Sequence, residues 1–174
     1  MTIKTILTEP DKILRQKSIE VETVGKNEQK IMNDMLETMY HANGIGLAAI
    51  QIGVPKRIIV MDISKSEENK NPLYFVNPVI RSKNSENSTY EEGCLSVPNF
   101  FAEIDRAKEC EVEYLDYKGE KKLLKAKGLL ATCIQHEMDH LEGILFIDYL
   151  SKLKKTIVIR KLLKKKDRPD RIIV

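Results

Sequence analysis

The chain has 174 residues, a length that fits one domain and leaves little room for a second one with its own core. With 42% hydrophobic and 32% charged residues, the composition excludes disordered and fibrous proteins, and 6% aromatic residues without Trp disfavour a nucleic-acid stacking surface. Three widely spaced cysteines, Cys94, Cys110 and Cys133, do not fit a secreted disulfide scaffold, so we expect a reducing, cytoplasmic location.

The net charge of +3 conceals an uneven distribution along the chain. Residues 151–174 contain ten Lys or Arg and two Asp, a net charge of +8, so the preceding part carries a net charge of −5. No apolar run approaches the ~20 residues that span a bilayer, and residues 1–10 lack the apolar core of a secretory signal. We therefore expect an acidic body with a basic C-terminal segment and no membrane partner.

One helix and one strand are predicted after an irregular start over residues 1–25. Apolar residues recur at helical spacing from Asn27 onwards, and Asn43-Gly44 is a natural stop. The stripe consists of Ile31, Met32, Met35, Leu36, Met39 and Tyr40. The short β-branched run at residues 58–61 then predicts a buried strand.

Further strands are predicted across the middle of the chain. Residues 73–81 form a strand pattern interrupted by Pro78, which indicates a bend or an edge. The polar stretches 64–72 and 82–91 are typical of solvated loops. Residues 109–116 alternate between glutamates and apolar residues, and a turn leads into a second alternating run at 121–127, which together predict a hairpin.

Two helices are predicted in the last third of the chain. One runs from Leu129 to about Leu141, with Gly143 as its stop, and the other from near Ser151 to Lys166. The expected buried side of the last helix comprises Leu153, Ile157, Leu162 and Leu163. Strands followed by helices without a βαβ rhythm predict an α+β fold, with mixed or antiparallel strands around a central helix and a C-terminal helix.

The sharpest motif is H-E-x-x-H at residues 136–140. On a helix, His136 and His140 lie one above the other, so both imidazoles can reach one metal ion, while Glu137 can hold a water beside it. The alternative is an ordinary helix with two exposed histidines. Since the chain has three histidines and two are here, we favour a metal site.

A catalytic zinc-type site needs a third protein ligand and one open position. No histidine follows downstream, and His41, at the end of the first predicted helix, fits a helix C-terminal cation. Cys94, beside the small Gly93, could supply a thiolate. A small buried thiol is the alternative for Cys94, as it is for Cys110 and Cys133, and the residues alone leave this open.

The segment 44–51, G-I-G-L-A-A-I-Q, contains two glycines and two alanines. It lacks the Lys-Ser/Thr of a phosphate loop, so a closely packed turn is the default interpretation. Gln51 could in addition offer an amide N–H to a developing oxyanion.

Taken in order, G-I-G-L-A-A-x-Q (44–51), E-G-C-L-S (92–96) and Q-H-E-M-D-H (135–140) resemble the peptide deformylases of the bacterial type. The resemblance extends to about Leu150 and so covers most of the chain. It implies a single catalytic domain over residues 1–174 with a central metal-binding helix. The implied activity is removal of the N-formyl group from the N-terminal methionine of newly synthesised proteins, with release of formate.

The resemblance also implies a role for each site residue. By this resemblance, Cys94, His136 and His140 bind the metal, and Glu137 is the catalytic acid–base. Gln51 and the Leu95 backbone N–H donate hydrogen bonds to the oxyanion. The residues that border the substrate include Ile45, Gly46, Leu129 and Cys133. The implied cofactor is one Fe²⁺ per chain, for which Zn²⁺, Ni²⁺ or Co²⁺ can substitute. The types of ligand residue do not distinguish among these ions.

Phe101 and Thr132 depart from the family pattern, and the acidic Asp105 just before Arg106 is a further local change. Phe101 stands where related enzymes often carry Arg at the pocket rim, and Thr132 replaces a commonly aliphatic residue beside the pocket. Neither belongs to the implied metal site, so we expect them to affect the preference for residues after the methionine.

The basic segment 151–174 suits a phosphate-rich partner, and we hypothesise that it holds the enzyme on ribosomal RNA. A solvated helix face is the alternative. Two further functions compete with the deformylase: a zinc endopeptidase, which needs a downstream third ligand that we do not find, and a non-enzymatic metal or ribosome-binding module, which needs no general base at Glu137.

Overall fold

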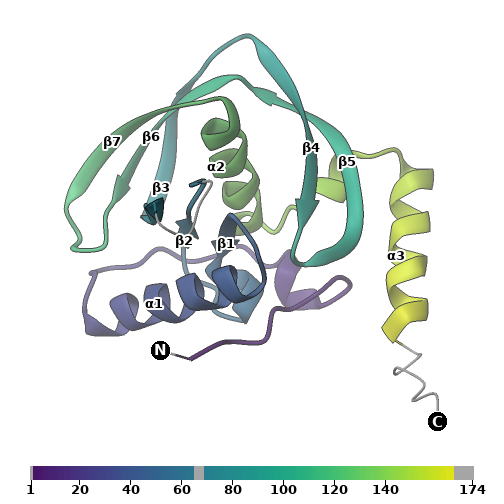
Figure 1. Ribbon diagram of the computed structural model, residues 1–174, viewed down its shortest axis with the longest axis horizontal. Helices are drawn as coiled ribbons and strands as arrows, with labels where there is room; N and C mark the ends of the chain where they lie inside the picture. Colours follow the sequence, from purple (N-terminus) through teal and green to yellow (C-terminus); the bar gives the residue numbers. More distant parts are fainter. Residues whose placement is uncertain (1, 65–68, 167–174) are drawn as a thin grey trace.

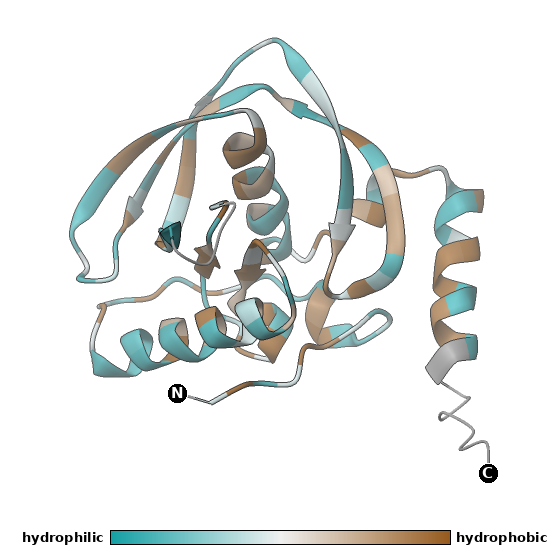
Figure 2. Cartoon of the chain, viewed as in Figure 1, coloured by the Kyte–Doolittle hydropathy of each residue, from teal (hydrophilic) through white to brown (hydrophobic). Residues whose placement is uncertain are grey.

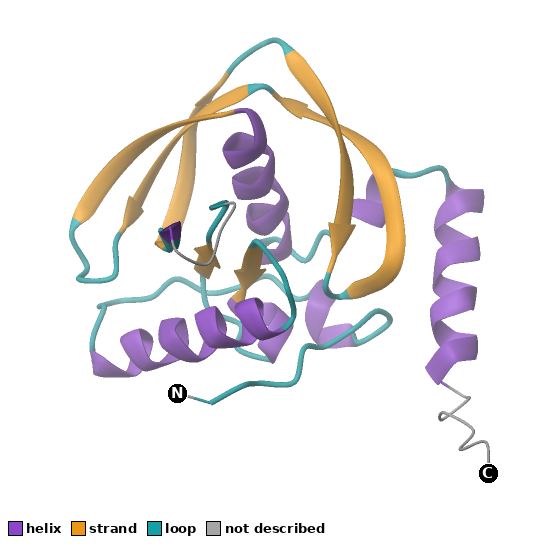
Figure 3. Cartoon of the chain, viewed as in Figure 1, coloured by secondary structure: helices purple, strands orange, loops and turns teal. Residues whose placement is uncertain are grey.

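A computed structural model describes residues 2–64 and 69–166, and shows two antiparallel β-sheets with three α-helices (Figure 3). The fold is therefore α+β, as predicted. None of the helices in these residues is long and apolar enough to cross a membrane. In chain order the elements are η1 (Lys12–Arg15), α1 (Lys26–His41), β1 (Gly46–Ala48), η2 (Ala49–Ile52), β2 (Ile58–Met61), β3 (Leu73–Lys83), β4 (Asn87–Cys94), β5 (Val97–Ala107), β6 (Glu109–Leu115), β7 (Lys121–Lys127), α2 (Gly128–Leu141), η4 (Phe146–Tyr149) and α3 (Lys152–Lys166).

The two sheets surround α2 (Figure 1). The larger sheet has the strand order β1-β2-β3-β6-β7, and the smaller one is the β4-β5 hairpin. All of these neighbours pair antiparallel. Because α2 contacts β1, β2, β5, β6 and β7, it links both sheets and places its side chains between them.

The first helix forms close to its predicted position. At its start the Glu28 carboxylate accepts a hydrogen bond from the Gly25 N–H at 3.1 Å, which satisfies a free donor and places negative charge at the helix N-terminus. Met32, Met35 and Met39 are fully buried in a cluster with residues of β1 and β2. This packing fixes α1 across the start of the larger sheet.

The hydropathy of helix α2 changes along its length. Its first half is hydrophobic and its second half is hydrophilic (Figure 2), although most of both halves is buried. The buried polar half therefore needs internal partners. The helix ends before Gly143, which has φ +74°, and a Cβ there would lie 2.5 Å from the Arg15 carbonyl oxygen. Only glycine fits this stop.

The bend predicted at Pro78 is present, whereas an edge position is wrong. The register between β3 and β6 shifts between Val76 and Val79, and Asn77 has φ +50°. Strand β3 nevertheless lies between β2 and β6. The side chain of Asn77 stabilises the bulge because it accepts from the Val21 N–H at 2.9 Å and donates to the Val21 carbonyl at 2.8 Å.

The loop predicted for residues 82–91 is largely wrong. Strand β3 extends to Lys83, and β4 begins at Asn87 and pairs with β5, a strand that was not predicted. Both faces of this hairpin are partly exposed, so polar residues such as Thr89 occupy strand positions, and the Thr89 hydroxyl donates to Asp105 across the pair at 2.6 Å. The polar residues of this segment therefore belong to paired strands rather than to a loop.

Helix α3 is present, but three of the four residues of its predicted buried side are exposed. Leu162 is buried as expected, whereas Leu153 is 72% exposed, and Ile157 and Leu163 are also exposed. Val158 completes the contact face instead, because α3 lies at the side of the molecule (Figure 1) and touches it along a narrow line. The other buried members of this cluster are Val97, Ile104, Leu145, Phe146 and Ile147. The part of the basic segment at residues 167–174 lies outside the described residues.

Candidate active site and metal centre

Three potential metal donors meet where α2 passes the end of β4. His136 and His140 are one turn apart on α2, and Cys94 is the last residue of β4. Their donor atoms all lie within 4.8 Å of one another, and Cys94 Sγ is 3.3 Å from His140 Nε2. Among residues 2–64 and 69–166 this is the one group of three such donors. His41 is not part of it and ends α1.

A buried carboxylate orients the first histidine of this group. Glu92 Oε2 accepts a hydrogen bond from His136 Nδ1 at 2.8 Å, which leaves Nε2 as the nitrogen available to a ligand. Burial raises the pKa of Glu92, but the hydrogen bonds from His136 and Arg106 outweigh it and hold the pKa below its ordinary value. Glu92 therefore stays ionised and fixes the His136 ring.

Arg106 holds two carboxylates beside the histidines. It is 6% exposed and donates through Nε and Nη2 to both oxygens of Glu92. Its Nη1 donates to Asp139 Oδ2 at 2.8 Å, and the Tyr149 hydroxyl donates to the same oxygen at 2.9 Å. This network of Glu92, Arg106, Asp139 and Tyr149 joins β4, β5, α2 and η4 around the donor group.

The carboxylate of Glu137 is buried and poised near neutrality. Glu137 is 4% exposed, its Oε2 has no hydrogen-bond partner, and burial raises its pKa to about 7. Its Oε1 occupies the space beside Gly46, where a Cβ would come within 2.4 Å. A carboxyl group in this state can accept and release a proton near pH 7.

The amide of Gln51 has a defined orientation. Its oxygen accepts from the Ala48 N–H at 2.8 Å, so its NH₂ group must point the other way. That group donates to Ser96 Oγ at 3.0 Å and lies 3.6 Å from Cys94 Sγ. An N–H donor is therefore fixed next to the sulfur of the donor group.

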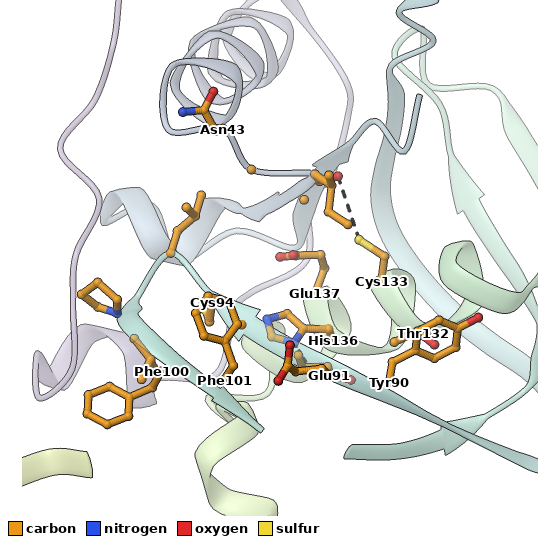
Figure 4. A pocket seen from close by; sticks show the side chains of 18 of the residues that line it. Asn43, Tyr90, Glu91, Cys94, Phe100, Phe101, Thr132, Cys133, His136 and Glu137 are labelled. Atoms are coloured by element: carbon orange, nitrogen blue, oxygen red, sulfur yellow. Dashed lines mark hydrogen bonds and ion pairs between the residues drawn. The ribbon is translucent and has the colours of Figure 1, made fainter. Parts of the chain in front are cut away.

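A pocket of about 490 Å³ opens beside these residues (Figure 4). The pocket walls include Ile45, Gly46, Gln51, Cys94, Leu95, Phe101, Leu129, Thr132, Cys133, His136 and Glu137. Ile45, Phe101 and Leu129 are exposed apolar residues of its lining, which suits an apolar ligand entering from solvent. The Cys133 thiol donates to the Ile45 carbonyl at 3.9 Å, and burial raises its pKa, so it stays protonated.

Comparison with known families decides which kind of enzyme carries this site. The model of the polypeptide deformylase family matches residues 3–156. The chain belongs to this family. Membership of the peptide deformylases makes it an enzyme, and it implies removal of the N-formyl group from nascent peptides.

Individual peptide deformylases are similar over almost the whole chain. The peptide deformylase of Pelagibacter ubique (strain HTCC1062) is 71% identical over 174 residues, which is 100% of both chains. The crystal structure of peptide deformylase from Ehrlichia chaffeensis has a TM-score of 0.91 at 43% identity and covers 95% of this chain and 98% of that chain. A second structure of that peptide deformylase, in complex with actinonin, has a TM-score of 0.90 at 46% identity and covers 97% and 100%.

The predicted site residues are brought together, while the residues that support them were missed. Glu92 and Ser96 lie within the E-G-C-L-S motif and Asp139 within H-E-x-x-H, yet no role was predicted for them or for Arg106. Because β5 was not predicted, nothing placed Arg106 opposite β4. A signal for Asp139 existed, since it lies between the two histidines of the motif.

Proposed function

We propose that this chain removes the formyl group from the N-terminal methionine of newly synthesised proteins with the help of one metal ion. The ion would be held by Cys94, His136 and His140. The observation that carries the proposal is the convergence of one cysteine sulfur and two imidazoles within 4.8 Å, beside an apolar pocket that Cys94 and His136 line. Three protein ligands of this kind leave one position open for chemistry.

The donor set fits a borderline divalent ion. Sulfur and imidazole nitrogen suit Fe²⁺, Zn²⁺, Ni²⁺ and Co²⁺ rather than Mg²⁺ or Ca²⁺, and we propose Fe²⁺ as the resident ion from the family resemblance. The hydrogen bond from His136 to Glu92 is the support that metal-binding histidines usually have. When bound, such an ion supplies Lewis acidity and lowers the pKa of water at the open position.

The proton transfers are assigned to Glu137. Its carboxylate lies in the pocket wall next to His136, takes a proton from the attacking water and returns it to the amine that leaves the formyl carbon. A pKa of about 7 matches both steps, because the group is neither fully protonated nor fully ionised near neutral pH. Formate and a free N-terminal methionine are the products.

Two donors are assigned to the oxyanion that forms on the formyl oxygen. The Gln51 NH₂ group is aimed toward Cys94 because the Gln51 oxygen is bound to the Ala48 N–H. The Leu95 backbone N–H follows Cys94 directly, and Leu95 lines the pocket. Fixed donors of this type stabilise the transition state more than the ground state.

The apolar pocket is assigned to the methionine side chain and the following peptide. Ile45, Gly46, Leu129 and Cys133 all line it, and the buried Cys133 stays a neutral thiol that suits an apolar ligand. Phe101 adds an aromatic ring that is 66% exposed at the same opening.

The test is formate release from formyl-Met-Ala-Ser by anaerobically purified protein loaded with Fe²⁺. We expect Glu137→Gln to lower kcat/KM by at least ~10²-fold at unchanged metal content, since a positioned acid–base contributes ~10²–10⁴. Glu103→Gln, on an exposed side chain of β5, is the matched control and keeps the activity. No formate from metal-loaded protein, or cleavage of internal peptide bonds instead, contradicts the proposal and favours the endopeptidase.

We propose further that residues 1–174 act as one catalytic domain, with the basic segment 151–174 as a contact for ribosomal RNA. Lys154, Arg160 and Lys164 are exposed on α3 and available to phosphates. The experiment is co-sedimentation with ribosomes at low and high salt. We expect the triple Glu variant of these residues to pellet less at low salt, whereas equal pelleting refutes the contact.

A further inference from the structure

The side-chain hydroxyl of Thr132 has no hydrogen-bond partner. Thr132 is 4% exposed, its Oγ1 is buried, and it lies on α2 in the wall of the pocket. Burying a hydroxyl without a hydrogen-bond partner costs ~1–3 kcal/mol of folding free energy, so each such group in a native structure calls for an explanation.

The usual local solution is not adopted here. A threonine within a helix can donate to the carbonyl one turn earlier, and Thr38 in α1 does so, to the Asp34 carbonyl at 2.6 Å. Thr132 has the same opportunity in α2, yet its Oγ1 makes no such bond. The hydroxyl is therefore left without a partner, and its oxygen is covered in the observed rotamer, within a wall that is otherwise largely apolar.

The position of Thr132 relative to the donor group indicates what it meets. It precedes His136 by four residues, so the two side chains lie on one face of α2, separated by one turn of ~5.4 Å. On the proposed function, the formyl group reacts at the donor group, and the pocket whose wall includes Thr132 receives the substrate's first side chain. Atoms near the end of an unbranched side chain then lie within reach of Thr132.

We propose that Thr132 is a specificity residue that donates a hydrogen bond to an acceptor atom near the end of the substrate's first side chain. The acceptor is the thioether sulfur of methionine or, more strongly, the oxygen of methionine sulfoxide. The inference rests on the proposed deformylase function and extends it to the discrimination between side chains of equal length. Rotation about χ1 exchanges the hydroxyl and the methyl group, so the oxygen can turn towards the ligand.

A purely steric role makes a different prediction. If Thr132 only fills space, Thr132→Val, which keeps the shape, has little effect on selectivity, and the smaller Thr132→Ser has the larger effect. If the hydroxyl is used, Thr132→Ser keeps the selectivity and Thr132→Val loses it.

The experiment measures kcat/KM for formyl-Met-Ala-Ser, its norleucine analogue and its methionine sulfoxide analogue with Fe²⁺-loaded protein. In Thr132→Val we expect the methionine-to-norleucine ratio to fall by ~3-fold and the sulfoxide-to-norleucine ratio by ~10-fold, as a net hydrogen bond implies. Thr132→Ser is expected to retain both ratios. Thr38→Val is the matched control for a buried helical threonine away from the pocket, and Thr132→Ala replaces Thr132→Val if valine prevents folding.

The outcomes separate this proposal from the function on which it rests. Unchanged ratios in Thr132→Val, or an equal loss in Thr132→Ser, overturn the role of the hydroxyl while formate release continues. Absence of formate from all three peptides with the unaltered, metal-loaded protein overturns the deformylase proposal itself.

Discussion

Replacing Arg106 with Met is the sharpest perturbation of the network behind the metal donors. Methionine keeps much of the length and apolar contact of the side chain while it removes the charge and all three hydrogen bonds to Glu92 and Asp139. Glu92 is 6% exposed, so its carboxylate would remain buried without its main counter-ion. The variant therefore tests whether this network holds the site together.

The expected loss of stability follows from burial. Breaking a buried pair by removing one partner costs ~3–5 kcal/mol, because an uncompensated charge remains. The exposed pair of Arg81 and Glu113 is also bonded through two nitrogens, at 2.8 and 3.3 Å, but its side chains are 53% and 37% exposed. Exposed pairs contribute ~0–1 kcal/mol, so Arg81→Met is the matched control.

The assay combines chemical denaturation of both metal-free variants with metal titration at neutral pH. We expect Arg106→Met to lower the free energy of unfolding by ~3 kcal/mol or more and Arg81→Met by less than ~1 kcal/mol. Metal affinity is expected to fall ~10–100-fold in Arg106→Met alone, because Glu92, which orients the His136 ring, loses the two hydrogen bonds that position it.

A second substitution tests the cause. Glu92→Gln in the Arg106→Met background removes the stranded charge, so it should recover part of the lost stability although it adds a mutation. Equal stability of Arg106→Met and Arg81→Met, or a further loss in the double variant, would refute the argument from buried charge.

Three other substitutions test separate parts of the structure. Gly46→Ala places a methyl group 2.4 Å from Glu137 Oε1, so we expect kcat to fall ~10²-fold at unchanged metal content, measured by formate release and metal analysis. Leu162→Ala should cost ~2 kcal/mol in denaturant unfolding, whereas Leu153→Ala, on the exposed side of α3, should stay within ~0.5 kcal/mol, and equal effects would contradict the observed contact face. Asp34 has a lowered pKa because a neighbouring lysine donates to it, so its stabilisation is present above its usual pKa of 3.8 and is lost as the pH falls through the lower folded value. Asp34→Asn should therefore reduce stability at neutral pH and weaken the acid dependence of unfolding; an unchanged pH profile would contradict this assignment.

The elements that sequence periodicity predicted well are those with one clearly buried side. Helices α1 and α2 and the β6-β7 hairpin have regular apolar repeats and clear stops, and all of them were predicted near their observed bounds. The β4-β5 hairpin was missed because both of its faces are partly solvated, so its residues do not alternate by hydropathy. The contact face of α3 was wrong because apolar residues occur on several sides of that helix.

The residues of the candidate site also differ in how far the sequence alone predicts their positions. Residues close together in the sequence, such as His136 and His140, can be placed by helix geometry alone. Cys94 required either the family resemblance or the fold, since it lies 42 positions before His136 and only the packing of β4 beside α2 brings them together. Arg106 was not predictable without β5, and the unpartnered hydroxyl of Thr132 became evident only from the structure.

Burial and the charges around Glu137 account for its raised pKa. Burial is the largest cause, and the carboxylates of Glu92 and Asp139 raise the pKa of Glu137 further. His136 and Arg106 lower it, and the balance of these effects leaves the pKa at about 7. A carboxyl group with this pKa can take a proton from water and return it to an amine near neutral pH, as the proposed deformylation requires.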